Sequence, residues 1–170
     1  MTYKPIFKLG ESENKKLLDS LSGWFEATKS ASLKAISFEQ AKEKGVIEED
    51  GTVNTKEGKV KAKKGSMICM GIEGELWVQE EKRLEDKYTK SNFLWKDVVK
   101  DVKWRIYNPK KEENKVRAVQ VNDREEFTVK ASWGNLKGKK GDYILQDIDN
   151  PDDVWIIDKN IFSKTYKYVS

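Results

Sequence analysis

The sequence predicts an α+β protein made of two tandem, homologous, β-rich units with small bent or barrel-like sheets. Three observations support this fold class: an internal repeat, short strand-like runs between turn residues, and stretches with helical spacing. The expected organisation is an N-terminal strand and helix extension over residues 1–23, a first unit over 24–89, a connecting helix over 90–101 and a second unit over 102–170.

Composition sets the size and excludes several chemistries. The chain has 170 residues, 37% of them apolar, with 33 Lys and Arg against 29 Asp and Glu, which suits one globular domain or two small ones. The absence of His excludes Ser-His-Asp and Cys-His nucleophile pairs and the usual His-containing zinc sites. Cys69 lies in an apolar stretch and is expected to be a buried, inert thiol.

The repeat is the strongest organising signal. Residues 58–72 align without gaps on residues 134–148, and a short insertion near Pro151 then brings Trp77 onto Trp155, Leu84 onto Phe162 and Tyr88 onto Tyr166. The gap-free stretch is identical at Gly58, Lys61, Lys63, Lys64, Gly65, Ile68 and Ile72, which align with Gly134, Lys137, Lys139, Lys140, Gly141, Ile144 and Ile148. We interpret this pattern as a duplication.

Each repeat is expected to be mostly strand. Runs such as 127–131, 141–146 and 154–157 are β-branched or aromatic and are bounded by Gly, Asn, Asp and Pro. Gly65 and Gly141 follow Lys-Lys pairs and are expected at turn positions with positive φ. A helical turn should follow each Trp strand, over residues 80–87 and 158–164, before a last strand that contains Tyr88 or Tyr166.

Four further elements are expected. Ser37 and Gln40 form a capping box for a helix over 38–44 that ends at Gly45, and residues 11–22 form an N-terminal helix. A hairpin that opens the second unit is predicted over residues 104–107 and 116–121, which lie on either side of an Asn-Pro turn. The connecting helix rests on apolar residues at three- and four-residue spacing, namely Leu94, Trp95, Val98, Val99 and Val102.

One part of the second unit resembles a known family. Four segments resemble the PGDYG family and related small phage proteins: Gly141-Asp142-Tyr143-Ile144, Trp155 to Asp158, Ile161-Phe162 and Thr165-Tyr166. Lys140 stands where the family usually has Pro. The first unit resembles it more weakly, because Ser66-Met67 replaces Asp-Tyr. The resemblance implies a small β-rich domain of bacterial or phage origin, for which the family offers no established activity.

Candidate contact residues come from the repeated segment. The Lys rows, together with Tyr143 and Trp133, could track a phosphate backbone while stacking bases, but alternating Lys also protects an exposed strand edge. Asp142 is interpreted chiefly as a turn residue, and Trp77 and Trp155 as core anchors. The contact candidates are Lys63, Lys64, Lys139, Lys140, Asp142, Tyr143 and Trp133; the structural motif comprises Gly65, Gly141, Trp77, Trp155, Phe162, Tyr88 and Tyr166.

The acidic stretch of Asp147, Asp149, Asp152, Asp153 and Asp158 lacks the spacing of a calcium loop and is interpreted as a solvated loop. No cofactor or metal is expected.

The leading functional hypothesis is a non-enzymatic binding module that recognises a protein or small ligand in a groove between the two units. Nucleic-acid binding is the alternative, and a His-independent enzyme that uses Asp, Glu, Lys or Tyr is the second. No apolar run reaches membrane-spanning length, so the prediction is a cytoplasmic protein with no membrane partner.

Overall fold

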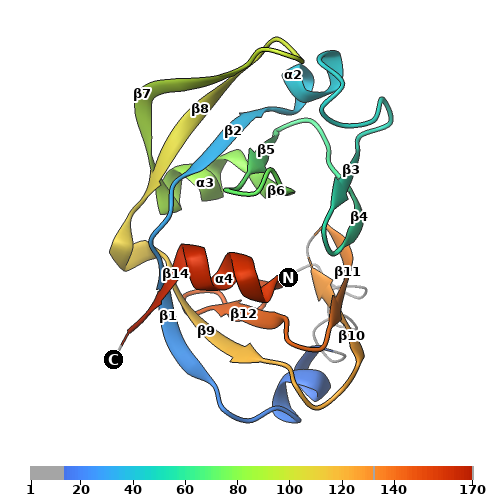
Figure 1. Ribbon diagram of the computed structural model, residues 1–170, viewed down its shortest axis with the longest axis vertical. Helices are drawn as coiled ribbons and strands as arrows, with labels where there is room; N and C mark the ends of the chain where they lie inside the picture. The colour runs from blue at the N-terminus through green and yellow to red at the C-terminus, as the bar shows by residue number, and fades with distance from the viewer. Residues whose placement is uncertain (1–13, 132, 170) are drawn as a thin grey trace. The chain divides into compact units, whose positions relative to one another are not determined.

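A computed structural model describes residues 14–131 and 133–169 of the chain (Figure 1). The fold is β-rich, with several small sheets and short helices, as the sequence predicts. The chain divides into two compact units. We call Lys29–Asn114 the central unit, and the two ends of the chain, residues 14–28 with 115–169, the terminal unit.

The central unit contains one five-stranded antiparallel sheet and one hairpin. The strand order of the sheet is β6-β5-β2-β8-β7, and β3 and β4 form the separate hairpin. The elements are β2 (Leu33–Ser37), α2 (Phe38–Glu43), β3 (Thr52–Thr55), β4 (Gly58–Lys61), β5 (Ser66–Met70), β6 (Leu76–Glu80), α3 (Glu81–Lys87), β7 (Tyr88–Asp97) and β8 (Val102–Pro109).

The terminal unit has the same plan. Its five-stranded sheet has the order β13-β12-β9-β1-β14, and β10 and β11 form the separate hairpin. The elements are β1 (Phe25–Lys29), β9 (Lys115–Gln120), β10 (Glu126–Ala131), β11 (Gly134–Lys139), β12 (Tyr143–Asp147), β13 (Val154–Ile157), α4 (Lys159–Thr165) and β14 (Tyr166–Tyr168). A short 3-10 helix, η1 (Lys111–Glu113), precedes β9.

The two sheets exchange one strand between the sequence repeats. β1 opens the first repeat, yet it pairs with β9 of the second, with Ala27 opposite Val116. β8 opens the second repeat and pairs with β2 of the first, with Leu33 opposite Tyr107. Each sheet therefore takes its fourth strand from the other repeat. This exchange is the reason why the compact units have other bounds than the expected 24–89 and 102–170.

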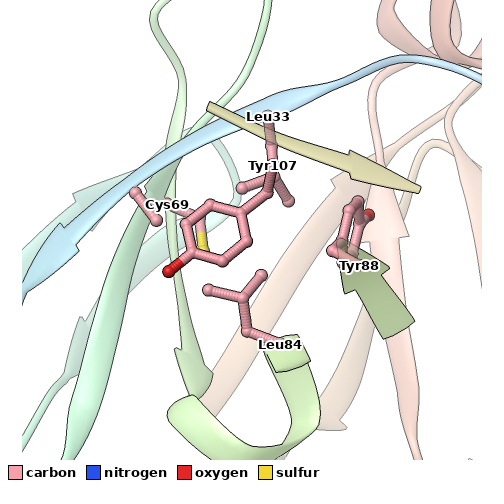
Figure 2. Close-up of a cluster of buried hydrophobic side chains, with 6 residues drawn as sticks. Leu33, Cys69, Leu84, Tyr88 and Tyr107 are labelled. Carbon is pink, nitrogen blue, oxygen red and sulfur yellow. The ribbon is translucent and has the colours of Figure 1, made fainter. Parts of the chain in front are cut away.

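Each unit has a core on one face of its sheet. In the central unit, Leu84 of α3 packs against the sheet residues Leu33, Ala35, Cys69 and Tyr107 and against Tyr88; Figure 2 shows Leu84 pointing from the helix towards Cys69 and Tyr107. In the terminal unit, Phe162 of α4 holds the matching place among Ala27, Val116, Ala118 and Leu145. The aligned pairs Leu84 and Phe162, and Tyr88 and Tyr166, thus occupy corresponding places in the two cores.

Two sequence-based expectations are wrong. Residues 90–101 are not a helix, because β7 continues to Asp97 and pairs with β8, with Trp95 opposite Trp104. Residues 104–121 are not a hairpin either, because β8 pairs with β7 and β2 while β9 pairs with β1 and β12. In both places, pairing with strands distant in sequence overrides the local pattern.

Several local predictions are confirmed. Ser37 is the N-cap of α2, and its side chain accepts a hydrogen bond from the Gln40 backbone N–H. Gly45 follows the helix with a φ of 72°. The N-terminal helix is described over residues 14–19, and the rest of its expected start, residues 11–13, lies outside the described residues.

Candidate functional site

The repeated Lys-Lys-Gly segment forms the same turn in both units. Gly65 and Gly141 have φ values of 94° and 99°, as the sequence predicts. The residue after each glycine donates its backbone N–H to the carbonyl three residues earlier, Ser66 to Lys63 at 3.0 Å and Asp142 to Lys139 at 2.9 Å. The left-handed glycine lets the chain reverse before β5 and before β12.

A side chain closes each turn. The Asp142 carboxylate, which is buried, accepts a hydrogen bond from the Lys139 backbone N–H at 3.0 Å. Ser66, at the aligned position, accepts the same bond from Lys63 N–H at 3.2 Å. The interpretation of Asp142 as a turn residue therefore fits the geometry, and a hydroxyl performs the same task in the central unit.

Lys139 joins the turn to the start of α4. Lys139 Nζ lies 3.4 Å from Asp142 Oδ1 and 3.6 Å from Asp158 Oδ2. Asp158 is the N-cap of α4 and accepts hydrogen bonds from the backbone N–H groups of Asn160 and Ile161. Desolvation alone would lower the pKa of Lys139, but the two carboxylates outweigh it and raise the pKa above its ordinary value. Lys139 is thus a paired cation in this structure.

The turn residues carry a stability prediction. We expect Gly141→Ala to cost about 1–2 kcal/mol, because a Cβ at φ 99° is strained and would lie 3.3 Å from Lys159 Cδ. Asp142→Asn keeps an oxygen acceptor and should cost less than about 1 kcal/mol, as Ser66 shows that no carboxylate is needed. Urea denaturation of the two variants measures both values. A larger loss for Asp142→Asn than for Gly141→Ala would reverse the assignment.

The other contact candidates differ in accessibility. Lys63, Lys64 and Lys140 are exposed, whereas Trp133 is half-buried in the β10–β11 turn. Tyr143 stacks on Phe162, with ring centroids 4.0 Å apart and an interplanar angle of 12°. The Tyr143 ring is thus engaged with the core, and burial raises the pKa of its hydroxyl. The structure does not place Tyr143 as a free stacking surface beside the lysines.

The two motif tryptophans lie at the rims of the cores. Trp77 and Trp155 are half-buried and pack against the two apolar clusters, opposite Cys69 and Leu145 on the neighbouring strands. Lys29 Nζ lies 4.8 Å from the Trp77 ring centroid and 5.5 Å from that of Tyr88. Burial raises the pKa of the Cys69 thiol to about 12 and raises that of the Tyr88 hydroxyl as well. Both groups are therefore neutral packing residues at physiological pH.

Two aspartates of the acidic stretch stabilise local structure, namely a turn and the start of a helix. Asp147 Oδ1 accepts a hydrogen bond from the Asp149 backbone N–H at 2.9 Å, and Asp158 caps α4. Within residues 14–131 and 133–169, no group of three or more His, Cys, Asp or Glu side chains is arranged to hold a metal ion.

The most distinctive surface feature lies where the sequence predicts the connecting helix. Figure 1 shows β7 and β8 running side by side to a turn near α2. This hairpin exposes five large apolar side chains near its end, which we call the hairpin patch: Phe93, Leu94, Trp95, Val98 and Val99. The spacing of four of these residues was the signal for a helix face, and their exposure could not be predicted from that spacing.

Comparisons with known proteins give no match: no protein-family model, no curated protein and no solved structure matches the chain. In the part of the chain that the structure describes, no helix combines the length and apolar character needed to cross a membrane.

Proposed function

We propose that the protein is a non-enzymatic binding module and that the hairpin patch is its recognition surface. The observation that carries this proposal is exposure: Val99 is 95% exposed, Val98 79% and Phe93 73%. Single exposed apolar residues are ordinary, but five near the end of one hairpin are typical of an interaction site. The groove between units that the sequence suggests is a separate hypothesis, and the hairpin proposal does not depend on it.

Hydrogen bonds and an ion pair brace the end of the hairpin. Asp97 Oδ1 accepts hydrogen bonds from the backbone N–H groups of Val99 and Lys100, at 3.1 and 3.2 Å. Lys44 Nζ lies 3.4 Å from Asp101 Oδ2, and Lys100 Nζ donates to the Gly45 carbonyl at 3.3 Å. These contacts tie the turn to the loop after α2. A surface that is already ordered loses less entropy when a partner binds.

The terminal unit shows that this extension is not needed to close the sheet. There, β1 occupies the place of β8 and has 5 residues, whereas β8 has 8. The sheet is complete without an apolar hairpin end. The extra length of β7 and β8 is therefore better explained by a binding role than by the stability of the fold.

A duplication is proposed for the origin of the two units. The shared strand order, the paired turns at Gly65 and Gly141, and the corresponding core residues Leu84 and Phe162 support it. The PGDYG-like segment around Asp142 and Tyr143 supports a proposed relationship to that family, with bacterial or phage origin. Neither proposal specifies a ligand.

A double substitution at the turn of the hairpin, which we call the tip variant, tests whether the hairpin serves binding or folding. We expect Val98→Ser/Val99→Ser to leave the free energy of unfolding within about 0.5 kcal/mol of wild type, because both side chains lie in water. In affinity capture from cells of the source organism, the tip variant should lose a component that the wild type retains. Ile72→Ser, which changes an exposed apolar residue outside the patch, should retain it. A loss of stability above about 1 kcal/mol, or equal capture by all three proteins, would contradict the proposal.

Nucleic-acid binding remains the alternative, supported by the exposed turn lysines of both repeats. It predicts that Lys137→Gln/Lys140→Gln weakens binding to random single- and double-stranded oligonucleotides and that affinity falls steeply with salt. Fluorescence polarisation measures this directly. Absence of binding at low salt would remove the alternative.

A further inference from the structure

The hairpin carries positive charge next to the patch. Lys96 and Lys103 lie directly opposite each other in the register of β7 and β8, and Arg105 is the next cross-strand neighbour, opposite Leu94. Like charges placed opposite each other destabilise a strand pair. The turn also carries two carboxylates, Asp97 and Asp101, but Lys44, Lys96, Lys100 and Lys103 outnumber them. The outward charge beside the patch is thus cationic.

The positive charge beside the patch distinguishes between the possible partners. A second copy would bring the same lysines against one another in a symmetric contact, which opposes self-association. Nucleic acid would match the charge, and Phe93 would offer a ring for base stacking, but the two most exposed residues of the patch, Val98 and Val99, are aliphatic and offer none. The remaining requirement is an anionic surface that also accepts apolar side chains.

The order of side chains along the hairpin adds a second argument. The turn presents Val98 and Val99. On the adjoining strands, Trp95 lies on one face of the hairpin, and the cross-strand pair Lys96 and Lys103 lies on the other. An apolar end with an aromatic residue and a cationic rim is the arrangement by which proteins enter the interface of a bilayer. A protein partner would need a matching acidic pocket for this projecting end, whereas lipid adapts to it.

We propose, resting on the function proposed above, that the hairpin patch docks the protein on the surface of a bilayer that contains anionic lipid. The absence of an apolar run of spanning length, from which the sequence predicts no membrane partner, concerns spanning segments and not surface docking. The few apolar side chains of the patch support weak, reversible attachment, which requires both the apolar and the ionic contribution.

Co-sedimentation of the full chain with lipid vesicles tests the proposal. Vesicles of phosphatidylcholine with 30% phosphatidylglycerol should bind the protein, and vesicles of pure phosphatidylcholine should bind it at least tenfold less. Val98→Ser/Val99→Ser should lower the partition coefficient at least tenfold. Lys96→Gln/Lys103→Gln should lower it by roughly tenfold to thirtyfold, because each lysine near an anionic surface contributes to attraction.

Matched controls separate local contacts from net charge. Lys137→Gln/Lys140→Gln removes the same charge from exposed lysines of the terminal unit and should leave vesicle binding within twofold of wild type. Ile72→Ser should do the same for an exposed apolar residue outside the patch. Equal losses from the two lysine pairs, or no binding of the wild type to anionic vesicles at low salt, would overturn the proposal.

A label on the turn reports insertion. Val99→Cys accepts a nitrobenzoxadiazole dye selectively, because the native Cys69 is fully buried. Dye emission should rise and shift to the blue on addition of anionic vesicles; an unchanged spectrum with bound protein would overturn insertion of the hairpin end. If vesicles fail to bind but a lysate protein is captured through Val98 and Val99, the bilayer inference fails and the binding-module proposal stands.

Discussion

Ala27→Asp should destabilise the protein by at least about 3 kcal/mol, since it places an unpaired carboxylate at a fully buried position. Ala27 lies on β1, opposite Val116 of β9, within the core of the terminal unit. The damage should therefore appear far along the chain. In native-state hydrogen exchange, amides of β9 and β12 should lose protection, while those of β2 and β5 should keep it.

Two further variants make this expectation specific to the strand exchange. Glu26→Gln changes an exposed residue of the same strand and should alter the free energy of unfolding by less than about 0.5 kcal/mol. Tyr107→Asp, at the corresponding place on β8, should reverse the pattern and expose β2 and β5. Loss of protection in β2 and β5 on Ala27→Asp would mean that each repeat keeps its own first strand.

Phe162→Ala should cost about 3–5 kcal/mol, the second large effect. The Phe162 ring is buried between two aromatic rings, with centroids 4.0 Å from Tyr143 and 5.3 Å from Tyr166. Removing it leaves a cavity that two stacked tyrosines cannot fill by small rotations, and it also removes the stacking contacts themselves. Guanidinium denaturation followed by circular dichroism measures the loss.

Leu84→Ala is the matched variant in the central unit. Leu84 fills the corresponding place but is aliphatic and makes no ring stacking, so its loss should cost about 2–4 kcal/mol, less than that of Phe162→Ala. A loss under about 1 kcal/mol for Phe162→Ala would show that α4 does not pack as described.

Local features of the fold could be predicted from the sequence because their causes are local. The turn at Gly141 follows from the need for positive φ, and the start of α2 follows from the side chain of Ser37, which caps a nearby N–H. The strands β12 and β13 follow from β-branched and aromatic runs between turn residues. The role of Asp142 could be predicted for the same reason, since its partner, Lys139, is three residues away.

Features that depend on distant pairing could not be predicted. Leu94, Trp95, Val98 and Val99 fit a helical period, but their segment pairs with β8, and a period contains no information about a partner strand. The exchange of β1 and β8 is hidden for a similar reason. The residues of a short strand do not identify the repeat with which it pairs. The sequence alone therefore favours two self-contained units. The hairpin patch was misassigned with the helix, because exposure is a property of the assembled sheet.

The position of β1 has a consequence for synthesis of the chain. β1 leaves the ribosome early, but its partner β9 begins only at Lys115. At 5–20 residues per second, the intervening stretch of roughly 90 residues takes about 5–20 s to appear. Once β8 has emerged, every strand of the central sheet is available for pairing. Phe25 and Ala27 on β1, by contrast, wait for β9. The nascent chain therefore presents an unpaired strand, and binding by a chaperone in this interval would prevent premature pairing with other chains.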